Sequence, residues 1–588
     1  MSEHVELPGG AWAWLYEGPE DAMALAGWAS DNPTMAVDTE TTGLDLYAGD
    51  VVTLVILANA TEAWVVPLDS SSRRELGEAL DAADHLIFHN AAFDLTALGD
   101  LVSDGWRRVI DTQIMSHLVD SRPKVAGGVG HGLKALAVAH VGAEWGEPED
   151  ERKKWFRENK WSESAGWKMA DPRSNEMVRY AGADGVMTFL LHDALELKLQ
   201  QLGGRTFELL GFERDVAATC WAMQERGLLI DTDTGLRIDA TLKLDERLAV
   251  NAARLLGVEN VNATSQVAEA LVAAGAVLPD LTPSGKSKVD KTVLRAISEG
   301  GGPGAGIASA VLTAKRAAKF RTVYVESVLD SLDADGRCHP QIRTLAAITG
   351  RMSISNPPLQ QLPAGDRTIR DMFIANPGMT LVAVDYSQIE LRVLAALAGE
   401  DQMIEAIKRG DDLHSITSIA VFGDAEPAHR KLAKIIGLGK VYGGGVATLA
   451  RQAQANEGLV RTAVMRYDDE FPKLKQFNRK MQTIAERSGI VTTISDRRIK
   501  IDTPYRAVNY AVQSAARDIF AKALVELGKC DDFEMLIPIH DEILVQCPTA
   551  QAELVKDHVV EVMTTELKGV PITAEGKVVG ERWGSAYE

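Results

Sequence analysis

Apolar, strand-like runs that end in carboxylates are the feature that most constrains how this chain can fold. One run ends in Asp38 and Glu40, and another, Met379–Asp385, leads directly into a helix-like segment, Ser387–Ala398. Alternation along a strand places Asp38 and Glu40 on the same face. A chain of 588 residues is too long for one hydrophobic core, so two to four domains are expected. The two acidic runs therefore belong to different parts of a multidomain protein.

The composition is that of an ordinary globular protein, with 46% apolar and 25% charged residues. No apolar run reaches membrane length, and the start of the chain lacks a basic segment followed by an apolar one, which argues against export. Four cysteines without CxxC spacing fit a reduced, metal-free set of thiols: Cys220, Cys338, Cys530 and Cys547. We therefore expect a cytoplasmic monomer that has no membrane contact.

The charge balance is acidic, with 62 Lys and Arg against 83 Asp and Glu and a formal charge of −21. Proteins that bind nucleic acid are often basic. Net charge, however, describes only the electrostatic potential far from the protein. Contacts with phosphate need only a local stripe of cations such as Lys315–Arg321. Because such a stripe fits a solvated helix face equally well, composition does not decide whether the chain binds nucleic acid.

The amino-terminal region is predicted to contain strands followed by helices. Short β-branched or apolar runs at Thr34–Asp38, Val51–Ala58 and Ala63–Leu68 have the pattern of a meander. A further strand at His85–Asn90 leads into a helix at Ala91–Leu101.

The central region is predicted to be mostly helical. It includes a helix at Glu176–Leu202, and a charged, Trp-containing stretch at Glu147–Trp167 is expected to be loop-like or mobile. A Gly/Pro/Ser-rich patch follows at 275–306. Its cluster Glu299–Gly306 cannot form regular structure without cost, so we expect it to join two helices of a mobile subdomain.

The carboxy-terminal region is expected to be largely helical over residues 402–490. After it, Met535–Ile539 and Ile543–Gln546 are predicted to be two strands, with Asp541 at the turn between them.

Three acidic motifs occur in order in the amino-terminal third of the chain. Asp38 and Glu40 form the first, Asp94 lies in Asn-x-x-x-Asp after a strand, and Tyr180 and Asp184 share a helix face. Cleavage of a phosphodiester needs two divalent ions roughly 3.5–4 Å apart, which hard oxygen ligands hold. A tyrosine hydroxyl can orient the attacking water. A lone Asp-x-Glu is weak evidence, but the three motifs in this order predict a metal-dependent nuclease.

A second constellation lies in the carboxy-terminal part. Asp385 and Asp541 are predicted to lie at the ends of adjacent strands, where they can bind two magnesium ions that activate a hydroxyl and hold a triphosphate. Every fourth residue of one predicted helix forms a stripe whose cationic end suits a triphosphate and whose aromatic end suits a base: Arg430, Lys434, Leu438 and Tyr442. Arg-x-x-x-Lys alone is more often a solvated helix face, but its occurrence together with the two aspartates favours a nucleotide site.

The first set of motifs resembles the DEDD-type 3′–5′ exonucleases with a tyrosine, which serve as proofreading domains of family A DNA polymerases. The second set is similar to motifs A, B and C of the same family. The similarity extends through further short motifs: Thr349–Ser353, Asn356–Pro363, Asp412–His414, Asn509 with Gln513, and Gly580–Trp583. The resemblance implies an α/β and α+β multidomain protein. An RNase H-like exonuclease domain at residues 1–205 would precede a right-hand polymerase domain at 206–588, with the thumb at about 232–335, the fingers at about 400–490 and the palm in the remainder.

The resemblance also implies roles for individual residues. Two Mg²⁺ ions in each centre, with Mn²⁺ as an alternative, would be held by Asp385, Asp541 and the carbonyl of Tyr386, and by Asp38, Glu40, Asp94 and Asp184. Contacts to the incoming dNTP fall on Arg430, Lys434, Leu438, Tyr442, His414, Gln388 and Glu390, and Glu390 resembles the gate that excludes a 2′-hydroxyl. Contacts to primer–template DNA fall on Arg351, Gln360, Asn509, Gln513 and His540. Replisome or processivity factors would be further partners.

The chain departs from the family pattern at Leu438, where an aromatic residue is usual, and at Gly437. Leucine offers no ring to the sugar, and a glycine within a helix costs roughly 0.5–1 kcal/mol relative to alanine, which could alter the closing step. The chain starts at the exonuclease region without a 5′-nuclease domain, a layout that resembles bacteriophage polymerases. Two alternatives remain open: an exonuclease with a non-catalytic DNA-binding module, and a non-enzymatic DNA clamp. The complete acidic sets favour a proofreading polymerase over both.

Overall fold

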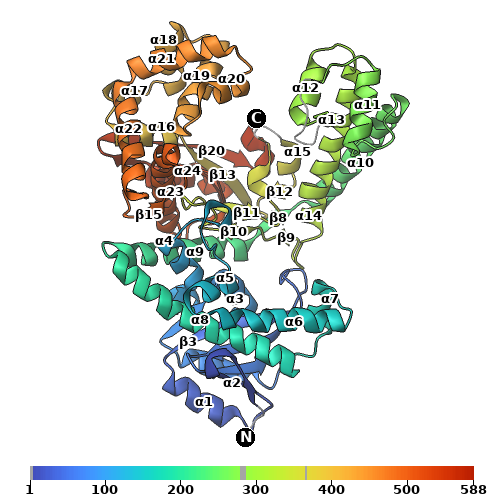
Figure 1. Ribbon diagram of the computed structural model, residues 1–588, viewed down its shortest axis with the longest axis vertical. Coiled ribbons are helices and arrows are strands. Elements are labelled where there is room, and N and C mark those ends of the chain that lie inside the picture. Colours follow the sequence, from blue (N-terminus) through green and yellow to red (C-terminus); the bar gives the residue numbers. More distant parts are fainter. Residues whose placement is uncertain (1–3, 103, 279–286, 364–366, 588) are drawn as a thin grey trace.

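The computed structural model describes residues 4–102, 104–278, 287–363 and 367–587. The amino-terminal lobe lies at one end of an elongated molecule, and two helical lobes rise from a central sheet region at the other (Figure 1). In the described ranges, no helix is long and apolar enough to cross a membrane.

The amino-terminal lobe is built on a seven-stranded sheet of order β1-β2-β5-β4-β3-β6-β7. The strands are β1 (His4–Glu6), β2 (Trp12–Leu15), β3 (Thr34–Thr41), β4 (Val52–Ala58), β5 (Glu62–Pro67), β6 (His85–Phe88) and β7 (Val109–Asp111). β3, β4 and β5 are successive antiparallel neighbours, which confirms the predicted meander. Alternate strand residues feed two cores, one shared with α1 (Ala22–Asp31), α2 (Arg73–Asp81) and α3 (Ala91–Leu98), the other with α8 (Asn175–Leu202).

The long helix α8 confirms the helix predicted at Glu176–Leu202 and lies directly on the sheet. A Cβ atom added to Gly182 would come within 2.6 Å of Ala13, and one added to Gly185 within 2.6 Å of Ile56. Real Cβ atoms do not approach so closely, so these glycines allow α8 to pack against the strands. The close approach brings the intervening Asp184 to the strand that carries Asp38 and Glu40.

The loop-like backbone predicted for Glu147–Trp167 was wrong, because the segment forms α6 (Glu147–Glu158) and α7 (Glu163–Met169). Its aromatic side chains pack on one another and on the core beneath α8: Trp155, Phe156, Trp161 and Trp167. Apart from the buried Arg152, the charged residues of α6 lie on the outer face of an amphipathic helix. Tertiary packing of the apolar face thus stabilises a helix that the charge content obscured.

The central region contains an antiparallel sheet of order β16-β17-β13-β20. Its strands are β13 (Met379–Tyr386), β16 (Glu534–Ile539), β17 (Glu542–Pro548) and β20 (Ala574–Gly580), and α23 (Ala507–Leu527) and α24 (Ala552–Met563) pack beside it. The three predicted strands are confirmed. Helix α16 (Ile389–Ala398) begins two residues later than predicted, because Gln388 adopts a left-handed φ of 54°.

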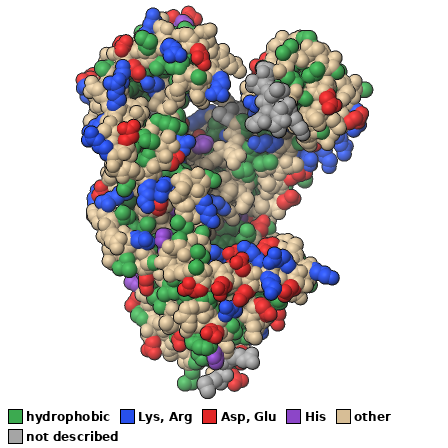
Figure 2. Space-filling view, viewed as in Figure 1, with side chains coloured by type: hydrophobic (Ala, Val, Ile, Leu, Met, Phe, Trp, Pro, Cys, Tyr) green, Lys and Arg blue, Asp and Glu red, His purple; other side chains and the backbone are tan. Residues whose placement is uncertain are grey.

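The two upper lobes are helical. One contains α10 (Thr232–Leu255), α11 (Thr264–Ala273), α12 (Lys291–Glu299) and α13 (Ala305–Lys319), so the glycine cluster joins two helices as predicted. Residues 279–286 of the Gly/Pro/Ser-rich patch lie outside the described residues. The other lobe contains α17 (Asp401–Arg409), α18 (Leu413–Phe422), α19 (Pro427–Val441), α20 (Val446–Ala453), α21 (Glu457–Glu470) and α22 (Pro472–Ser488), which confirms the helical prediction. A deep hollow separates the two lobes (Figure 2).

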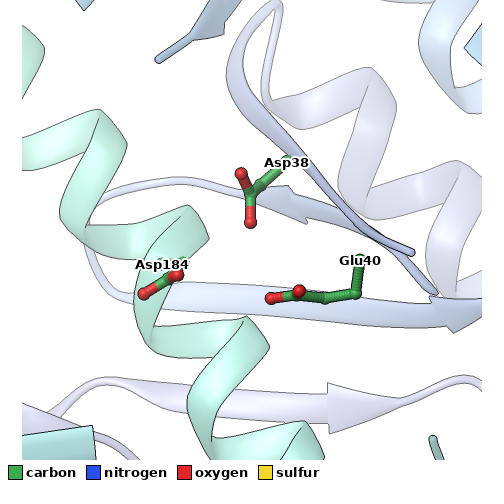
Figure 3. Close-up of side chains that lie close together, drawn as sticks. All are labelled: Asp38, Glu40 and Asp184. Atoms are coloured by element: carbon green, nitrogen blue, oxygen red, sulfur yellow. The ribbon is translucent and has the colours of Figure 1, made fainter. Parts of the chain in front are cut away.

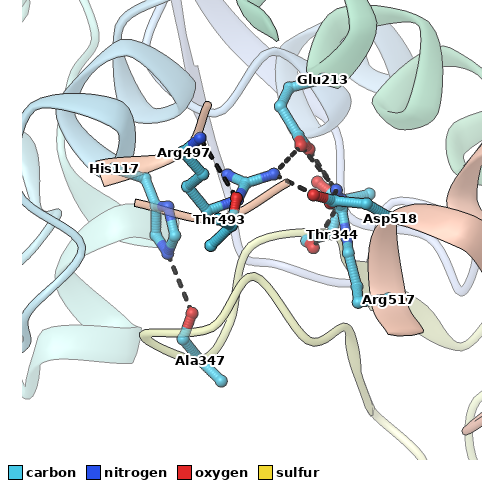
Figure 4. Close-up of polar contacts among 8 residues, drawn as sticks. All are labelled: His117, Glu213, Thr344, Ala347, Thr493, Arg497, Arg517 and Asp518. Carbon is cyan, nitrogen blue, oxygen red and sulfur yellow. Dashed lines mark hydrogen bonds and ion pairs between the residues drawn. The ribbon is translucent and has the colours of Figure 1, made fainter. Parts of the chain in front are cut away.

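A buried ionic cluster joins separate elements of the carboxy-terminal part of the molecule (Figure 4). Glu213 of α9 (Thr206–Arg226) accepts hydrogen bonds at both carboxylate oxygens from Arg517 of α23, at 2.5 and 2.7 Å, and also pairs with Arg497. Arg497 lies 3.1 Å from Asp518. Beside this cluster, the Lys500 ammonium lies 3.0 Å from Asp120 of the amino-terminal lobe. The Lys500–Asp120 pair connects the amino-terminal lobe to the strand that carries Lys500, and α9 also packs against this lobe.

Candidate active sites

Three carboxylates converge in the amino-terminal lobe (Figure 3). Asp38 and Glu40 extend from the same face of β3, as predicted, and Asp184 faces them from α8. One ligand oxygen of each lies within 4.8 Å of the others. Glu40 and Asp184 are buried, and Asp38 is half-buried. Three hard oxygen donors within this distance fit a divalent cation.

Asp94 is close to this group but is not part of it. It is buried on α3 and accepts a 2.7 Å hydrogen bond from the hydroxyl of Thr39. Asp111, at the end of β7, accepts hydrogen bonds from the backbone N–H groups of Asn90 and Ala91 and thereby orients the start of α3. The predicted fourth acid is therefore near the cluster, with its carboxylate held by β3 itself.

Burial dominates the electrostatics of these acids. It raises the pKa of Asp38 to about 6, although the charge of Lys134 acts in the opposite direction. Burial and the neighbouring charge of Asp38 also raise the pKa of Glu40 and of Asp94. Crowded buried carboxylates resist ionisation unless cations compensate them. The cluster therefore suits cations in contact with its oxygens.

Tyr180 lies one turn before Asp184 on α8 and is buried beside the acids. Burial, followed by the charges of Glu40 and Asp38, raises its pKa well above the usual value. Two cations lie against its ring: the Lys134 ammonium at 4.5 Å and the Arg152 guanidinium at 5.0 Å from the centroid. The phenol is thus held in its protonated form next to the carboxylates.

Sequence reasoning missed Lys134 and Arg152. Lys134 lies on α5 (Leu133–His140) and forms an ion pair with Asp184, while Arg152 of α6 pairs with Glu163 at 2.7 Å. Neither residue lies within an acidic motif. The available signal for Lys134 was its position as a single cation in an otherwise small and apolar segment, Gly132–Val138.

The second pair of carboxylates lies at one end of the central sheet. Asp385 is the penultimate residue of β13 and is opposite Glu542 in β17, and the backbone N–H of Tyr386 donates to the carbonyl of Asp541 at 3.3 Å. His540 adopts a left-handed φ of 59° at the tight turn before Asp541. Adjacent strands thus bring the two predicted aspartates together, although they are far apart in sequence.

These aspartates are more open than the first set. The Asp385 side chain is exposed, yet protein surrounds it on several sides, and this desolvation together with Asp541 and Glu542 raises its pKa to about 7. Burial likewise raises the pKa of Asp541. Paired oxygen donors of this kind fit a divalent ion, and Tyr386, the third predicted ligand, directly follows Asp385 on β13.

The predicted stripe lies on α19. Arg430 pairs with Asp412 at 2.8 Å, and Gln388 donates to the same carboxylate at 3.0 Å, so Asp412 links two predicted nucleotide contacts. Lys434 is exposed on the same helix, and Leu438 is half-buried against the core of this lobe.

At the far end of the stripe, the Tyr442 hydroxyl donates to Glu390 at 2.8 Å, and Arg351 forms an ion pair with the other oxygen of Glu390. The pattern missed Asp412 as a member of the site, although it lies two residues before the predicted His414.

The remaining predicted contacts differ in how closely the structure places them to these residues. His414 is buried on α18, and burial lowers its pKa. Gln513 of α23 accepts a 3.3 Å hydrogen bond from the hydroxyl of Thr349, next to the loop of Arg351. Asn509 is buried one turn earlier on α23, Gln360 is half-buried, and His540 is exposed.

The chain thus has two separate groups of carboxylates, one in the amino-terminal lobe and one at the end of the central sheet. Such oxygen donors suit the metal ions that phosphoryl-transfer enzymes use. A family model described as DNA polymerase family A matches residues 238–585, and one described as 3′–5′ exonuclease matches residues 17–200. The chain belongs to DNA polymerase family A and carries a 3′–5′ exonuclease domain. The polymerase and exonuclease domains of this family depend on metal ions.

The chain is similar to two phage proteins along nearly their whole length. It is 37% identical to the DNA polymerase of Mycobacterium phage D29 and 33% identical to that of Mycobacterium phage L5, with 97% of each chain covered. DNA polymerase I of Pseudomonas aeruginosa is 26% identical over 94% of this chain and 64% of its own length. The fold matches the polymerase domain of Pol1 from M. smegmatis, solved with DNA primer-template and dNTP, with a TM-score of 0.77 at 23% identity, over 98% of this chain and 100% of that one.

Proposed function

We propose that the chain binds primer–template DNA and dNTPs, extends the primer at the Asp385–Asp541 centre, and removes mispaired ends at the Asp38–Glu40–Asp184 centre. The observation that carries the proposal is the presence of two separate carboxylate centres, each with its own set of neighbours. Synthesis uses the primer 3′-hydroxyl as the attacking group and removal uses water, so two separate sites allow each reaction its own geometry.

At the polymerase centre, Asp385, Asp541 and the Tyr386 carbonyl would hold two Mg²⁺ ions, with Mn²⁺ as an alternative. When bound, these ions lower the pKa of the primer 3′-hydroxyl and stabilise charge on the transferring phosphoryl group. Asp385 and Asp541 keep their oxygens at adjacent strand ends, where the backbone of a paired sheet limits their movement. The contribution of the protein is therefore rigid positioning.

The triphosphate of the dNTP would bind along α19 at Arg430 and Lys434, with His414 and Gln388 nearby. Asp412 holds the guanidinium of Arg430 and the amide of Gln388. A triphosphate is a stronger anion than one carboxylate and would displace Asp412 from Arg430. Nucleotide binding would thus exchange one ion pair for another without leaving a buried charge unpaired.

Discrimination against ribonucleotides would depend on Glu390. Tyr442 and Arg351 each hold one oxygen of its carboxylate, which fixes the side chain in one position. A fixed carboxylate at the sugar leaves no room for a 2′-hydroxyl. Leu438 would lie beside the same sugar and, as an aliphatic residue, would offer it neither a ring edge nor a hydroxyl.

At the editing centre, Asp38, Glu40 and Asp184 would hold the metal ions directly. Asp94, which accepts a hydrogen bond from Thr39, would act on the ions from beside this group. The protonated Tyr180 would orient the attacking water with its hydroxyl. Because these acids are buried, the centre suits a single unpaired strand end better than a duplex.

The duplex would lie in the hollow between the upper lobes (Figure 2), where Arg351, Gln360, Asn509, Gln513 and His540 would contact the primer and template. This layout corresponds to an exonuclease domain at 1–205 and a polymerase domain at 206–588, with the thumb at about 232–335, the fingers at about 400–490 and the palm in the remainder. The similarity to two phage polymerases supports a role in phage DNA replication in the host cytoplasm. We propose a monomer that works with replisome or processivity factors.

Primer extension with four dNTPs and Mg²⁺, together with digestion of the primer without dNTPs, tests the proposal. Asp385→Asn should abolish extension only, and Asp38→Asn should abolish digestion only. Asp401→Asn, a change of an exposed carboxylate that pairs with Lys473, is the matched control and should affect neither.

An exonuclease with a non-catalytic DNA-binding module would digest but not extend, and a DNA clamp would do neither. Loss of both activities from either single change in folded protein would contradict separate centres.

A further inference from the structure

Lys134 places a positive charge directly on a carboxylate of the editing centre. Its ammonium forms an ion pair with Asp184, one of three acids whose oxygens lie within 4.8 Å of one another. Its side chain is 21% exposed and that of Asp184 is 7% exposed, so little water screens this pair. A protein cation therefore lies where divalent ions are expected to bind.

The fold holds Lys134 firmly in this place. Lys134 is the second residue of α5, whose start is tied to the sheet by a 2.9 Å hydrogen bond from the ring of His89 to the carbonyl of His131. His89 follows β6 directly, so the same strand end orients α5 and the helix that carries Asp94. The ammonium also contacts the Tyr180 ring at 4.5 Å.

The other nearby cation, Arg152, also lies against the Tyr180 ring, but its ion pair is with an acid outside the three-acid group. Arg152 pairs with Glu163 at 2.7 Å, and its guanidinium lies 4.5 Å from the ring of Trp167 and 4.7 Å from that of Phe156. Within the described part of the chain, Lys134 is the cation that pairs directly with a member of the three-acid group. Buried carboxylates without a counter-ion are costly, so this lysine stabilises the cluster when no metal is bound.

We propose that Lys134 is a tethered cation of the editing centre, which pairs with Asp184 in the metal-free protein and must release it before a divalent ion can bind there. The lysine therefore competes with metal for one ligand and weakens metal binding in the absence of DNA. The phosphate of an entering strand offers the ammonium another anion, so arrival of the substrate favours the exchange. The editing centre would remain in a metal-poor state until a strand end occupies it. This inference rests on the metal site proposed above.

Direct measurement of Mn²⁺ binding without DNA tests the competition. Asp385→Asn and Asp541→Asn are introduced together to remove Mn²⁺ binding at the polymerase centre. Mn²⁺ is then titrated into the protein, and electron paramagnetic resonance measures the concentration of the free ion. Lys134→Met in this background should bind Mn²⁺ about tenfold more tightly, because a unit positive charge beside the ligands is lost. Lys134→Arg keeps the charge and should bind as weakly as the parent.

Lys154→Met is the matched control, since it removes an equivalent charge from an exposed pair with Glu158 in the same lobe. Lys134→Gln is measured in parallel, so that a folding failure of the methionine variant leaves the test in place. Thermal unfolding gives a second readout that does not depend on activity. Removal of Lys134 should lower the midpoint in EDTA and enlarge the rise that Mn²⁺ produces.

Unchanged or weaker Mn²⁺ binding in Lys134→Met and Lys134→Gln would contradict competition between Lys134 and the metal. Lys134 would then only position the Tyr180 ring that it contacts. That role predicts slower digestion at an unchanged metal affinity. If the parent binds no Mn²⁺ that Asp38→Asn removes, the proposed metal site itself fails, which is a different result from equal affinity in parent and variant.

Discussion

The two groups of carboxylates that we propose as catalytic centres lie in different surroundings. At the editing centre, buried acids from β3 and α8 face one another, and a lysine pairs with one of them. At the polymerase centre, Asp385 is exposed at one end of an antiparallel sheet and forms no ion pair within the described ranges. A site for a single strand end can be enclosed and charge-balanced by the protein itself. A site for a duplex must stay open, so its ligands supply the balancing charge.

The largest expected effect comes from removing one acid from each centre. Asp541→Asn should reduce primer extension on the order of a thousandfold and leave digestion intact, because a charge that acts in the transition state is lost. Asp184→Asn should do the reverse. Steady-state extension and digestion rates for both variants would measure the separation, and parallel losses of both activities would break the comparison between two centres.

Glu213 tests the role of α9, the helix that packs against the amino-terminal lobe and is paired to the central region. Glu213→Gln removes the carboxylate that Arg497 and Arg517 share and leaves both guanidiniums to the single carboxylate of Asp518, so the free energy of unfolding should fall by about 3–5 kcal/mol. Chemical denaturation followed by circular dichroism measures this loss. Both activities should survive at low temperature and disappear together on warming. A variant that loses one activity at a lower temperature than the other would indicate that the lobes unfold separately.

A change at Leu438 tests the proposed polymerase centre without altering the editing centre. Leu438→Phe should change the single-turnover extension rate and the use of dideoxynucleotides by about tenfold, because a ring replaces an aliphatic side chain beside the sugar. Primer–template affinity and digestion should stay as they are. Rapid-quench extension with dNTP and ddNTP pairs provides the measurement, and equal rates and equal terminator use would contradict the expected role.

The glycines on either side of Leu438 give the smallest effect. A Cβ at Gly437 meets no atom within 4 Å, so Gly437→Ala should stabilise α19 by roughly 0.5–1 kcal/mol and slow the closing step. A Cβ at Gly439 would lie 2.0 Å from Leu449, so Gly439→Ala should destabilise the lobe instead. Thermal unfolding and nucleotide-dependent fluorescence would separate the two. Identical shifts for both variants would argue against this difference in packing.

Local patterns predicted most of the architecture and both acidic sets. The strands ending near Asp38 and Asp385 were visible because apolar residues and carboxylates follow one another in sequence, and hairpin geometry brought Asp541 next to Asp385. The prediction for the segment Glu147–Trp167 was wrong because its local pattern is misleading. Its charged residues dominate the local pattern, and the helix is stabilised by aromatic contacts with a core that sequence spacing does not reveal.

The sequence by itself predicted which residues would hold metal ions and nucleotides, because short motifs at strand ends and along one helix are typical of those groups. The tertiary structure decided what surrounds them. Lys134 meets Asp184, Asp412 holds Arg430, and Glu213 joins two arginines from α23 and the β14 (Ile490–Thr492)–β15 (Arg498–Lys500) hairpin. Each of these contacts joins residues from different elements of the fold. Only the packing of helices and hairpins against one another brings such charges within bonding distance, and this packing depends on residues far apart in the sequence.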